Sequence, residues 1–225
     1  MSKSNVIERI QSNLSNTIDA ILNHQYLDSL EKNAINKEKL EIFVCEQYHI
    51  IANDRRNFAF MISKAATDLA SKLFIDCLDA ELNALGNLTF MADELATDKR
   101  KIENYEPLAG RQAHTNYLTR LAVYGSDAEI LSTLLIDLAV WGANCGKMSS
   151  ILKNKYGFGE NSCVFLDKFA TPLSEEFVNK SKELIYSAFL QSEKSLHTAG
   201  RLILDYELSF WDTIYKHSII KEYHS

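Results

Sequence analysis

The scarcity of helix-breaking residues is the feature that most limits what this chain can fold into. Its 225 residues include only 8 Gly and 2 Pro, and neither occurs between Met1 and Asn83. Gly and Pro are the strongest interrupters of regular structure. The alternation of apolar and polar residues that indicates half-buried strands is absent. The chain is therefore predicted to be all-α, with long helices.

Breaks between helices are predicted where turn residues cluster. Ser126 and Glu129 form a capping-box sequence directly after Gly125, which makes this the clearest boundary. Long helices with short connections bury apolar stripes against one another, so we expect one bundle of about seven to eight helices in a single domain, 1–225. The expected helices span 3–32, 36–66, 67–96, 111–124, 126–156, 173–193 and 195–221, with breaks at 33–36, 106–110, 125–126, 157–159 and 171–172.

Charge and composition exclude several classes of partner. The 24 basic and 30 acidic residues give a net charge of −6, and no block of five or more Lys and Arg occurs. A nucleic-acid or anionic-membrane surface is therefore not expected. The most apolar stretch, Ile130–Ala143, contains Asp137 and is too short to cross a bilayer. Because the four cysteines form no C-x-x-C pair and residues 6–16 are polar, we expect a cytoplasmic protein with free thiols.

Five polar side chains interrupt the apolar stripes of the predicted helices. Gln47 and Asp54 lie two turns apart on one stripe, Glu81 completes another, and Asp137 and Glu207 are each surrounded by Leu, Phe and Trp residues. Burying such groups costs free energy unless something pairs with them. Acids directed inward from three helices predict a polar cavity, as in bundles that bind ligands, cofactors or metals. The alternative is that each acid pairs with an Arg or a backbone group at a helix crossing.

A metal site has weaker support. Glu46 and His49 have the i, i+3 spacing of the Glu-x-x-His segments in di-iron bundles, and Glu81 could complete such a set. The other five His lack a comparable carboxylate partner on an interior stripe. No nucleotide-binding loop or nucleophile elbow occurs either. No cofactor is predicted, and a di-iron centre is kept as the alternative.

Three segments resemble one known family. The last helix, Tyr206–Tyr215, resembles the Y-E-x-x-F-W-x-x-A-Y end of the TenA family of thiaminase-type proteins, whose fold is that of haem oxygenase. Residues His24–Gln47 and Arg120–Leu135 resemble the same family without gaps. The resemblance implies an all-α fold of two three-helix layers around a central pocket, shared with PqqC and the CADD-like proteins.

The resemblance also implies roles for the inward residues. Glu207 corresponds to a pocket glutamate that handles protons, and Asp137 stands where the family has its nucleophilic cysteine. These two are the predicted catalytic residues. Gln47 replaces an aspartate that holds the substrate's pyrimidine. The predicted ligand pocket consists of Gln47, Asp54, Glu81, His114, Trp141, Tyr206 and Trp211, with His114 and Trp141 each in place of a pocket tyrosine.

Departures from the family pattern limit the activity that can be expected. A carboxylate at position 137 is a far poorer nucleophile than a thiolate, and Cys145 lies more than two helical turns away, so thiamin cleavage is not expected. In CADD-like proteins a glutamate is followed seven residues later by a histidine, whereas here Glu81 is followed by Leu88. Residues 165–195 contain no His, so stoichiometric iron is not expected either.

Two functions of different classes follow. One is a small-molecule-binding protein or a cofactor-metabolism enzyme that holds an organic molecule in the central pocket. The other is a non-catalytic regulatory or protein-interaction member of the same fold, and a di-iron oxidase with atypical ligands is a further alternative. A cavity of a few hundred cubic ångströms favours the first, whereas a cavity filled by Trp141 and Phe169 favours the second. A homodimer or larger homo-oligomer is expected in either case.

Overall fold

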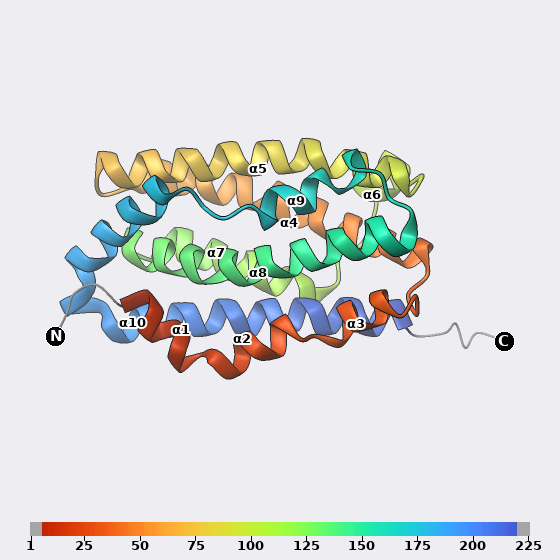
Figure 1. Cartoon of the computed structure of the whole chain (residues 1–225). Coiled ribbons are helices and arrows are strands. Elements are labelled where there is room, and N and C mark those ends of the chain that lie inside the picture. The colour runs from red at the N-terminus through yellow and green to blue at the C-terminus, as the bar shows by residue number, and fades with distance from the viewer. Residues whose placement is uncertain (1–5, 220–225) are drawn as a thin grey trace.

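The computed structural model describes residues 6–219, except for the side chains of residues 189–192, and every regular element in this part is helical. The predicted all-α class is confirmed. Figure 1 shows an elongated bundle in which most helices run along one common direction. Its elements are α1 (Val6–Asn13), α2 (Ser15–Leu22), α3 (Gln25–Glu31), η2 (Lys37–Lys39), α4 (Leu40–Lys64), α5 (Asp68–Glu94), α6 (Lys99–Glu103), α7 (Ala109–Tyr124), α8 (Asp127–Tyr156), η3 (Asn161–Cys163), α9 (Val164–Ala170) and α10 (Glu175–Ile219).

The bundle is built from two groups of helices with α8 between them. Helix α4 packs on α5 and α7, while α9 packs on α5 and α8. On the other side, α10 packs on α7 and α8, and the short helices α1–α3 cover α10 and α8 (Figure 1). The interior between these groups receives side chains from α4, α5, α7, α8, α9 and α10, and this is where the polar side chains predicted to point inward meet.

Several predicted helix boundaries agree with the structure. The Ser126 hydroxyl accepts a hydrogen bond from the Glu129 backbone, and the Glu129 carboxylate accepts one from the Ser126 backbone, which completes the capping box of α8. At its other end α8 stops at Gly157, whose φ of 73° is left-handed. Glycine adopts this conformation without the steric cost that a Cβ imposes. The sequence therefore located both ends of the longest central helix.

The predicted helix over 3–32 is wrong within the described residues, because α1, α2 and α3 replace it. Positions 3–5 lie outside the described part of the chain. No Gly or Pro marks these breaks; the break at Leu14 has no side-chain cap, whereas polar side chains supply the caps between α2 and α3. The His24 Nδ1 atom accepts a hydrogen bond from the Tyr26 backbone and starts α3, and the Asn23 side chain donates to the Asp19 carbonyl at the end of α2. Asn and other short polar residues compete with helical hydrogen bonding in this way.

At the other end of the chain, two helices that the sequence predicts as separate are joined. The helices predicted over 173–193 and 195–221 form one continuous helix, α10, as far as Ile219, and residues 220–221 lie outside the described part. No Gly or Pro separates the two predicted segments, and Figure 1 shows that α10 bends without ending. The short helices α6 and α9 were not predicted, because five and seven residues are too few for a clear periodic pattern.

Helix α8 is long and apolar enough to cross a membrane by length and composition alone. In the fold, 72% of its most apolar 18-residue window is buried against other helices. Asp137, in the middle of this helix, is also buried. Helix α8 is therefore the core helix of the bundle.

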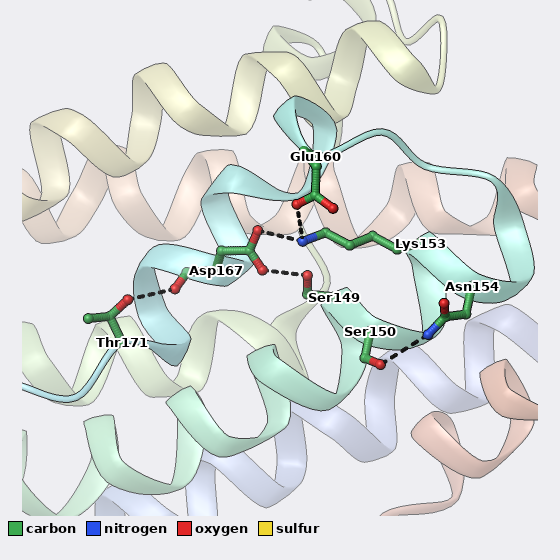
Figure 2. A network of polar contacts seen from close by, with 7 residues as sticks. All are labelled: Ser149, Ser150, Lys153, Asn154, Glu160, Asp167 and Thr171. Carbon is green, nitrogen blue, oxygen red and sulfur yellow. Dashed lines mark hydrogen bonds and ion pairs between the residues drawn. The ribbon is translucent and has the colours of Figure 1, made fainter.

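A polar network joins the second half of α8 to α9 (Figure 2). The Ser149 hydroxyl donates to Oδ1 of Asp167 at 2.5 Å, and Lys153 Nζ donates to Oδ2 of the same carboxylate at 2.9 Å. Lys153 also contacts Glu160 at 2.7 Å. Close packing supports this junction, since a Cβ on Gly142 would lie 2.5 Å from the Phe169 carbonyl oxygen. The network and the glycine together hold α9 against α8.

Replacing Asp167 with Ala should therefore lower the free energy of unfolding by about 1–2 kcal/mol, because the buried Ser149 hydroxyl loses its acceptor and Lys153 loses one of its two. Thermal unfolding monitored by circular dichroism would measure this. Glu160→Gln is the matched control, because the Glu160 side chain is 84% exposed and its pair with Lys153 contributes little. Equal stability of Asp167→Ala and the control would show that the network does not fasten α9.

Candidate functional site

The inward-facing acids from the sequence line one cavity of about 70 Å³ between six helices. We call it the carboxylate cavity. Four carboxyl groups and one imidazole meet there, and the rest of its wall is aliphatic, aromatic or amide. Its lining residues are Gln47, Ile50, Ile51 and Asp54 of α4, Glu81 of α5, His114 of α7, Asp137, Leu138 and Trp141 of α8, Phe169 of α9, and Glu207 and Phe210 of α10.

His114 and Asp137 form an ion pair across the cavity. The imidazole Nε2 lies 3.0 Å from Oδ2 and 3.2 Å from Oδ1 of Asp137, and since a carboxylate can only accept, Nε2 carries the hydrogen. Burial alone would lower the pKa of His114. The Asp137 carboxylate, with Asp54 and Glu207 beyond it, outweighs burial and raises this pKa to about 9. His114 is therefore a cation at neutral pH, and it is the one cation among the lining residues.

Glu207 forms no ion pair with any residue that the structure describes. Its side chain is 2% exposed, and Trp211 Nε1 donates to Oε1 at 3.2 Å. No donor among the described residues reaches the buried Oε2 atom. Burial, followed by the charge of Asp137, raises the pKa of Glu207 well above its ordinary value. The protonated form of Glu207 is therefore favoured over a wider pH range than in an exposed glutamate, and in that form Glu207 can donate a proton into the cavity or to Asp137.

The other two acids differ in their hydrogen bonds. Thr115 donates its hydroxyl proton to Asp54 Oδ1, which also accepts from Asn57 Nδ2 at 3.0 Å. Burial raises the pKa of Asp54 to about 6, while His114 and these two hydrogen bonds lower it in part. Burial and the charge of Asp54 raise the pKa of Glu81 to about 8. At neutral pH the cavity thus holds ionised and neutral carboxyl groups beside one another, which suits proton transfer.

Aromatic side chains limit the room on the other side of the cavity. Trp141 stacks on Phe43 with ring centroids 6.2 Å apart and planes only 6° apart. It also makes edge contacts with Phe169 and Phe210, at 6.1 and 5.6 Å. A volume of about 70 Å³ holds roughly two water molecules, since each occupies about 30 Å³ in the liquid. A larger ligand therefore requires Trp141 or Phe169 to move.

Two predicted pocket residues lie elsewhere. Tyr206 precedes Glu207 in α10 and consequently faces another side of that helix, where it lines a separate pocket with Tyr117. Trp211 is fully buried in the core and contributes by donating to Glu207, not by lining the cavity. Successive helical residues point about 100° apart, which accounts for the different directions of Tyr206 and Glu207.

The residues of the alternative metal set are not brought together. Glu46 accepts hydrogen bonds from the Tyr105 hydroxyl and the Leu108 backbone, both at 2.9 Å. His49 Nε2 contacts the Ile102 carbonyl at 3.1 Å, whereas Glu81 faces the carboxylate cavity. Within residues 6–219 no three His, Cys, Asp or Glu side chains are arranged to hold a metal ion. Glu46 and His49 instead fasten the segment around α6 to α4, so they do not fit a di-iron centre.

Some residues of the site were not found from the sequence. Thr115 and Asn57 hold Asp54, and Asn53 Nδ2 in turn donates to the Thr115 hydroxyl at 2.8 Å. Thr115 follows His114 directly, but neither Asn nor Thr stands out in a helix without knowledge of which helices cross. Phe210 belongs to the terminal motif Tyr206–Tyr215 and also lines the cavity.

No cysteine lines the carboxylate cavity. Cys145, which follows Asp137 by just over two turns of α8, is fully buried. Burial, followed by the charge of Glu207, raises the pKa of its thiol well above the ordinary value. Burial raises the pKa of Cys45 and Cys163 to about 11 as well. None of these three thiols is activated as a nucleophile.

Solved structures with the same arrangement of helices come from several organisms. A TenA homologue from Pyrococcus furiosus aligns with a TM-score of 0.70 and 22% identity, over 93% of this chain and 100% of that one. A TenA homologue from P. horikoshii OT3 aligns with a TM-score of 0.76 and 17% identity, over 94% and 98%. A domain of unknown function with a haem oxygenase-like fold, from Shewanella denitrificans OS217, gives 0.74 and 14% over 97% of both chains. These likenesses show the haem oxygenase-like fold.

The sequence itself also matches a family. No curated protein matches it at a significant level. The profile of the TENA/THI-4/PQQC family matches residues 11–217, which is nearly the whole chain. The match includes all twelve residues that line the carboxylate cavity. The resemblance seen in the terminal motif is thereby confirmed, and this chain belongs to the TENA/THI-4/PQQC family.

Proposed function

We propose that this protein binds a small nitrogen-containing organic molecule in the carboxylate cavity and moves a proton on it. In this proposal Glu207 is the proton donor. The His114–Asp137 pair supplies one positive and one negative charge in the same cavity. The reaction would be one that needs acid and base groups but no thiolate nucleophile. Family membership supports a small-molecule site at this place. The carboxyl groups and the imidazole of the cavity support proton transfer as its chemistry.

One observation carries this proposal. The buried Oε2 atom of Glu207 belongs to the wall of a cavity and receives no hydrogen bond from a donor among the described residues, while Asp137 is the neighbouring group that can accept its proton. Leaving a buried polar atom unpaired costs about 1–3 kcal/mol. A ligand that accepts from or donates to this atom recovers that free energy. The surrounding carboxyl groups favour a ligand rich in N–H donors over an anion.

The direct test is a titration with 4-aminopyrimidine, a small ring with ring nitrogens and an amino group, followed by ligand-observed NMR at pH 7. We expect wild-type protein to bind it and Glu207→Gln to bind about ten- to a hundredfold more weakly, because an uncharged amide cannot transfer the proton and offers a weaker hydrogen bond. Benzoate, an anion of similar size, should not bind.

The control variant is Glu160→Gln, which makes the same chemical change at a side chain that is 84% exposed and far from the cavity lining. It should bind like wild type. Equal affinity of wild type and Glu207→Gln would contradict the role of Glu207. Tighter binding of benzoate than of 4-aminopyrimidine would contradict the proposed ligand class.

A non-catalytic role is the second candidate, and the small cavity favours it. About 70 Å³ is below the range of roughly 300–1,000 Å³ that ligand pockets usually occupy. Trp141 fills the space that a ring would need. If Trp141→Ala binds 4-aminopyrimidine while wild type does not, the tryptophan closes the site and the non-catalytic role is supported. Binding by wild type supports the first candidate.

Two further expectations belong to this proposal. All four cysteines, Cys45, Cys77, Cys145 and Cys163, are free in the structure, which supports a reducing cytoplasmic environment. Assembly as a homodimer or larger homo-oligomer also remains a prediction. Native mass spectrometry would report the assembly together with any molecule that the purified protein retains.

A further inference from the structure

A second pocket, on the side of α10 away from Glu207, is much roomier than the carboxylate cavity. Its volume is about 540 Å³, within the range of roughly 300–1,000 Å³ typical of small-molecule sites. We call it the tyrosine pocket. Its lining residues are Tyr117 and Arg120 of α7, Glu129 of α8, and Lys194, Ser195, Thr198, Ala199, Leu202 and Tyr206 of α10.

Two cations of the tyrosine pocket have no acidic partner among the described residues. Arg120 and Lys194 are both exposed, and neither forms an ion pair there, in contrast to Arg201, which pairs with Asp205 at 2.6 Å. The acid of the pocket, Glu129, is engaged elsewhere, because its Oε2 accepts from the Ser126 backbone and hydroxyl at 2.8 and 2.9 Å. The pocket is thus cationic in a chain whose net charge is −6.

Two tyrosine rings form an aromatic wall beside these cations. The rings of Tyr117 and Tyr206 have centroids 5.3 Å apart, with their planes inclined at 45°. The Arg120 guanidinium lies 6.0 Å from the centre of the Tyr117 ring. Burial raises the pKa of Tyr117, although Arg120 lowers it in part, so the phenol stays protonated and can donate a hydrogen bond. Aromatic faces beside arginine stack planar rings well.

We propose that the tyrosine pocket binds a phosphomonoester of a planar heterocycle, a molecule of mononucleotide size. The ring would pack on Tyr117 and Tyr206, and the phosphate would be held by Arg120 and Lys194. Arginine matches the geometry of phosphate oxygens, and lysine adds a point charge. An uncharged ring would leave the two cations without a partner, and inorganic phosphate would leave the two tyrosines uncovered. The contributions of the ring and of the phosphate can therefore be tested separately.

The experiment compares three probes by ligand-observed NMR titration at constant ionic strength: adenosine 5′-monophosphate, adenosine and inorganic phosphate. We expect the monophosphate to bind at least about tenfold more tightly than either fragment. Arg120→Gln and Lys194→Gln should each weaken monophosphate binding by about ten- to a hundredfold, the usual effect of losing a charge-assisted hydrogen bond. Adenosine binding should not change.

Matched controls remove the same charges outside the pocket. Arg56→Gln and Lys32→Gln alter exposed residues that do not line it, and both should bind the monophosphate like wild type. Equal loss in the controls would show that net charge alone is responsible. Equal affinity for adenosine and its monophosphate, or no binding of the monophosphate, would overturn the proposal. Melting temperatures close to wild type ensure that a loss of binding reflects the pocket and not unfolding.

This site is independent of the proposed function. Glu207 belongs to the carboxylate cavity and not to the lining of the tyrosine pocket. Glu207→Gln should therefore keep monophosphate binding while it loses 4-aminopyrimidine binding, and Arg120→Gln should do the reverse. Each proposal consequently stands or fails by its own variant.

Discussion

Replacing His114 with Gln should lower the free energy of unfolding at pH 8 by about 3–5 kcal/mol, the usual cost of removing one partner from a buried ion pair. Asp137, which is 5% exposed, would lose its only ionic partner among the described residues. Asp54 and Glu207 would lose the nearby cation as well. The expected fall in Tm is on the order of 10 °C, measurable by differential scanning calorimetry.

Two further variants make this result specific. The double variant His114→Gln/Asp137→Asn removes both charges, so its loss of stability should be clearly smaller than the sum of the single losses. Additive losses would mean that the two side chains do not interact. Glu207→Gln should keep or raise Tm, because it replaces a buried acid that forms no ion pair within the described part of the chain. The sequence predicts the same role for Asp137 and Glu207. In the structure Asp137 forms an ion pair with His114, so the two variants should affect stability differently.

Stability should also fall as the pH rises from 6 to 9, with a decrease in Tm on the order of 5–10 °C. The pKa of His114 is about 9 in the folded protein against an ordinary 6.5, so its stabilising charge is fully present below pH 6.5 and is lost as the pH rises through 9. The pKa of Glu81 is about 8 against an ordinary 4.5. The folded state therefore binds protons that the unfolded state has released, and deprotonation favours unfolding for both groups.

Variants at these two positions should flatten the pH dependence. Glu81→Gln removes a group that must ionise in a partly buried site, so its Tm should exceed that of wild type at pH 9 and approach it at pH 5. The control Glu160→Gln should follow the wild-type curve, because the Glu160 side chain is exposed. A wild-type Tm that rises between pH 6 and 9 would show that neither His114 nor Glu81 has the shifted pKa described above.

Much of the local structure followed from the sequence because it depends on neighbouring residues only. The absence of Gly and Pro over the first 85 positions, the capping box at Ser126 and the glycine stop at Gly157 are all short-range signals. Where caps came from Asn and His side chains, as at Asn23 and His24, the same reasoning missed the breaks. Such side chains also occur within helices, and only their hydrogen bonds decide which role they take.

The inward direction of the acids could likewise be read from periodicity, since a helix places every third or fourth residue on one face. Asp54, Asp137 and Glu207 were identified in this way, and all three are buried. Periodicity within one helix says nothing about which residue of another helix it meets. The pairing of His114 with Asp137, and the absence of an ion-pair partner for Glu207 among the residues that the structure describes, could not be predicted from it.

The sequence by itself determined an all-α chain, the family to which it belongs, and a set of polar side chains directed into the bundle. Only the tertiary structure decided how those side chains combine. It packed Trp141 against Phe43 in the wall of the carboxylate cavity, whose volume is about 70 Å³. It directed the Tyr206 side chain towards a separate pocket, which Arg120 also lines. The physical reason is that helix periodicity is a local property, whereas distances between side chains depend on how helices from distant parts of the chain cross and pack.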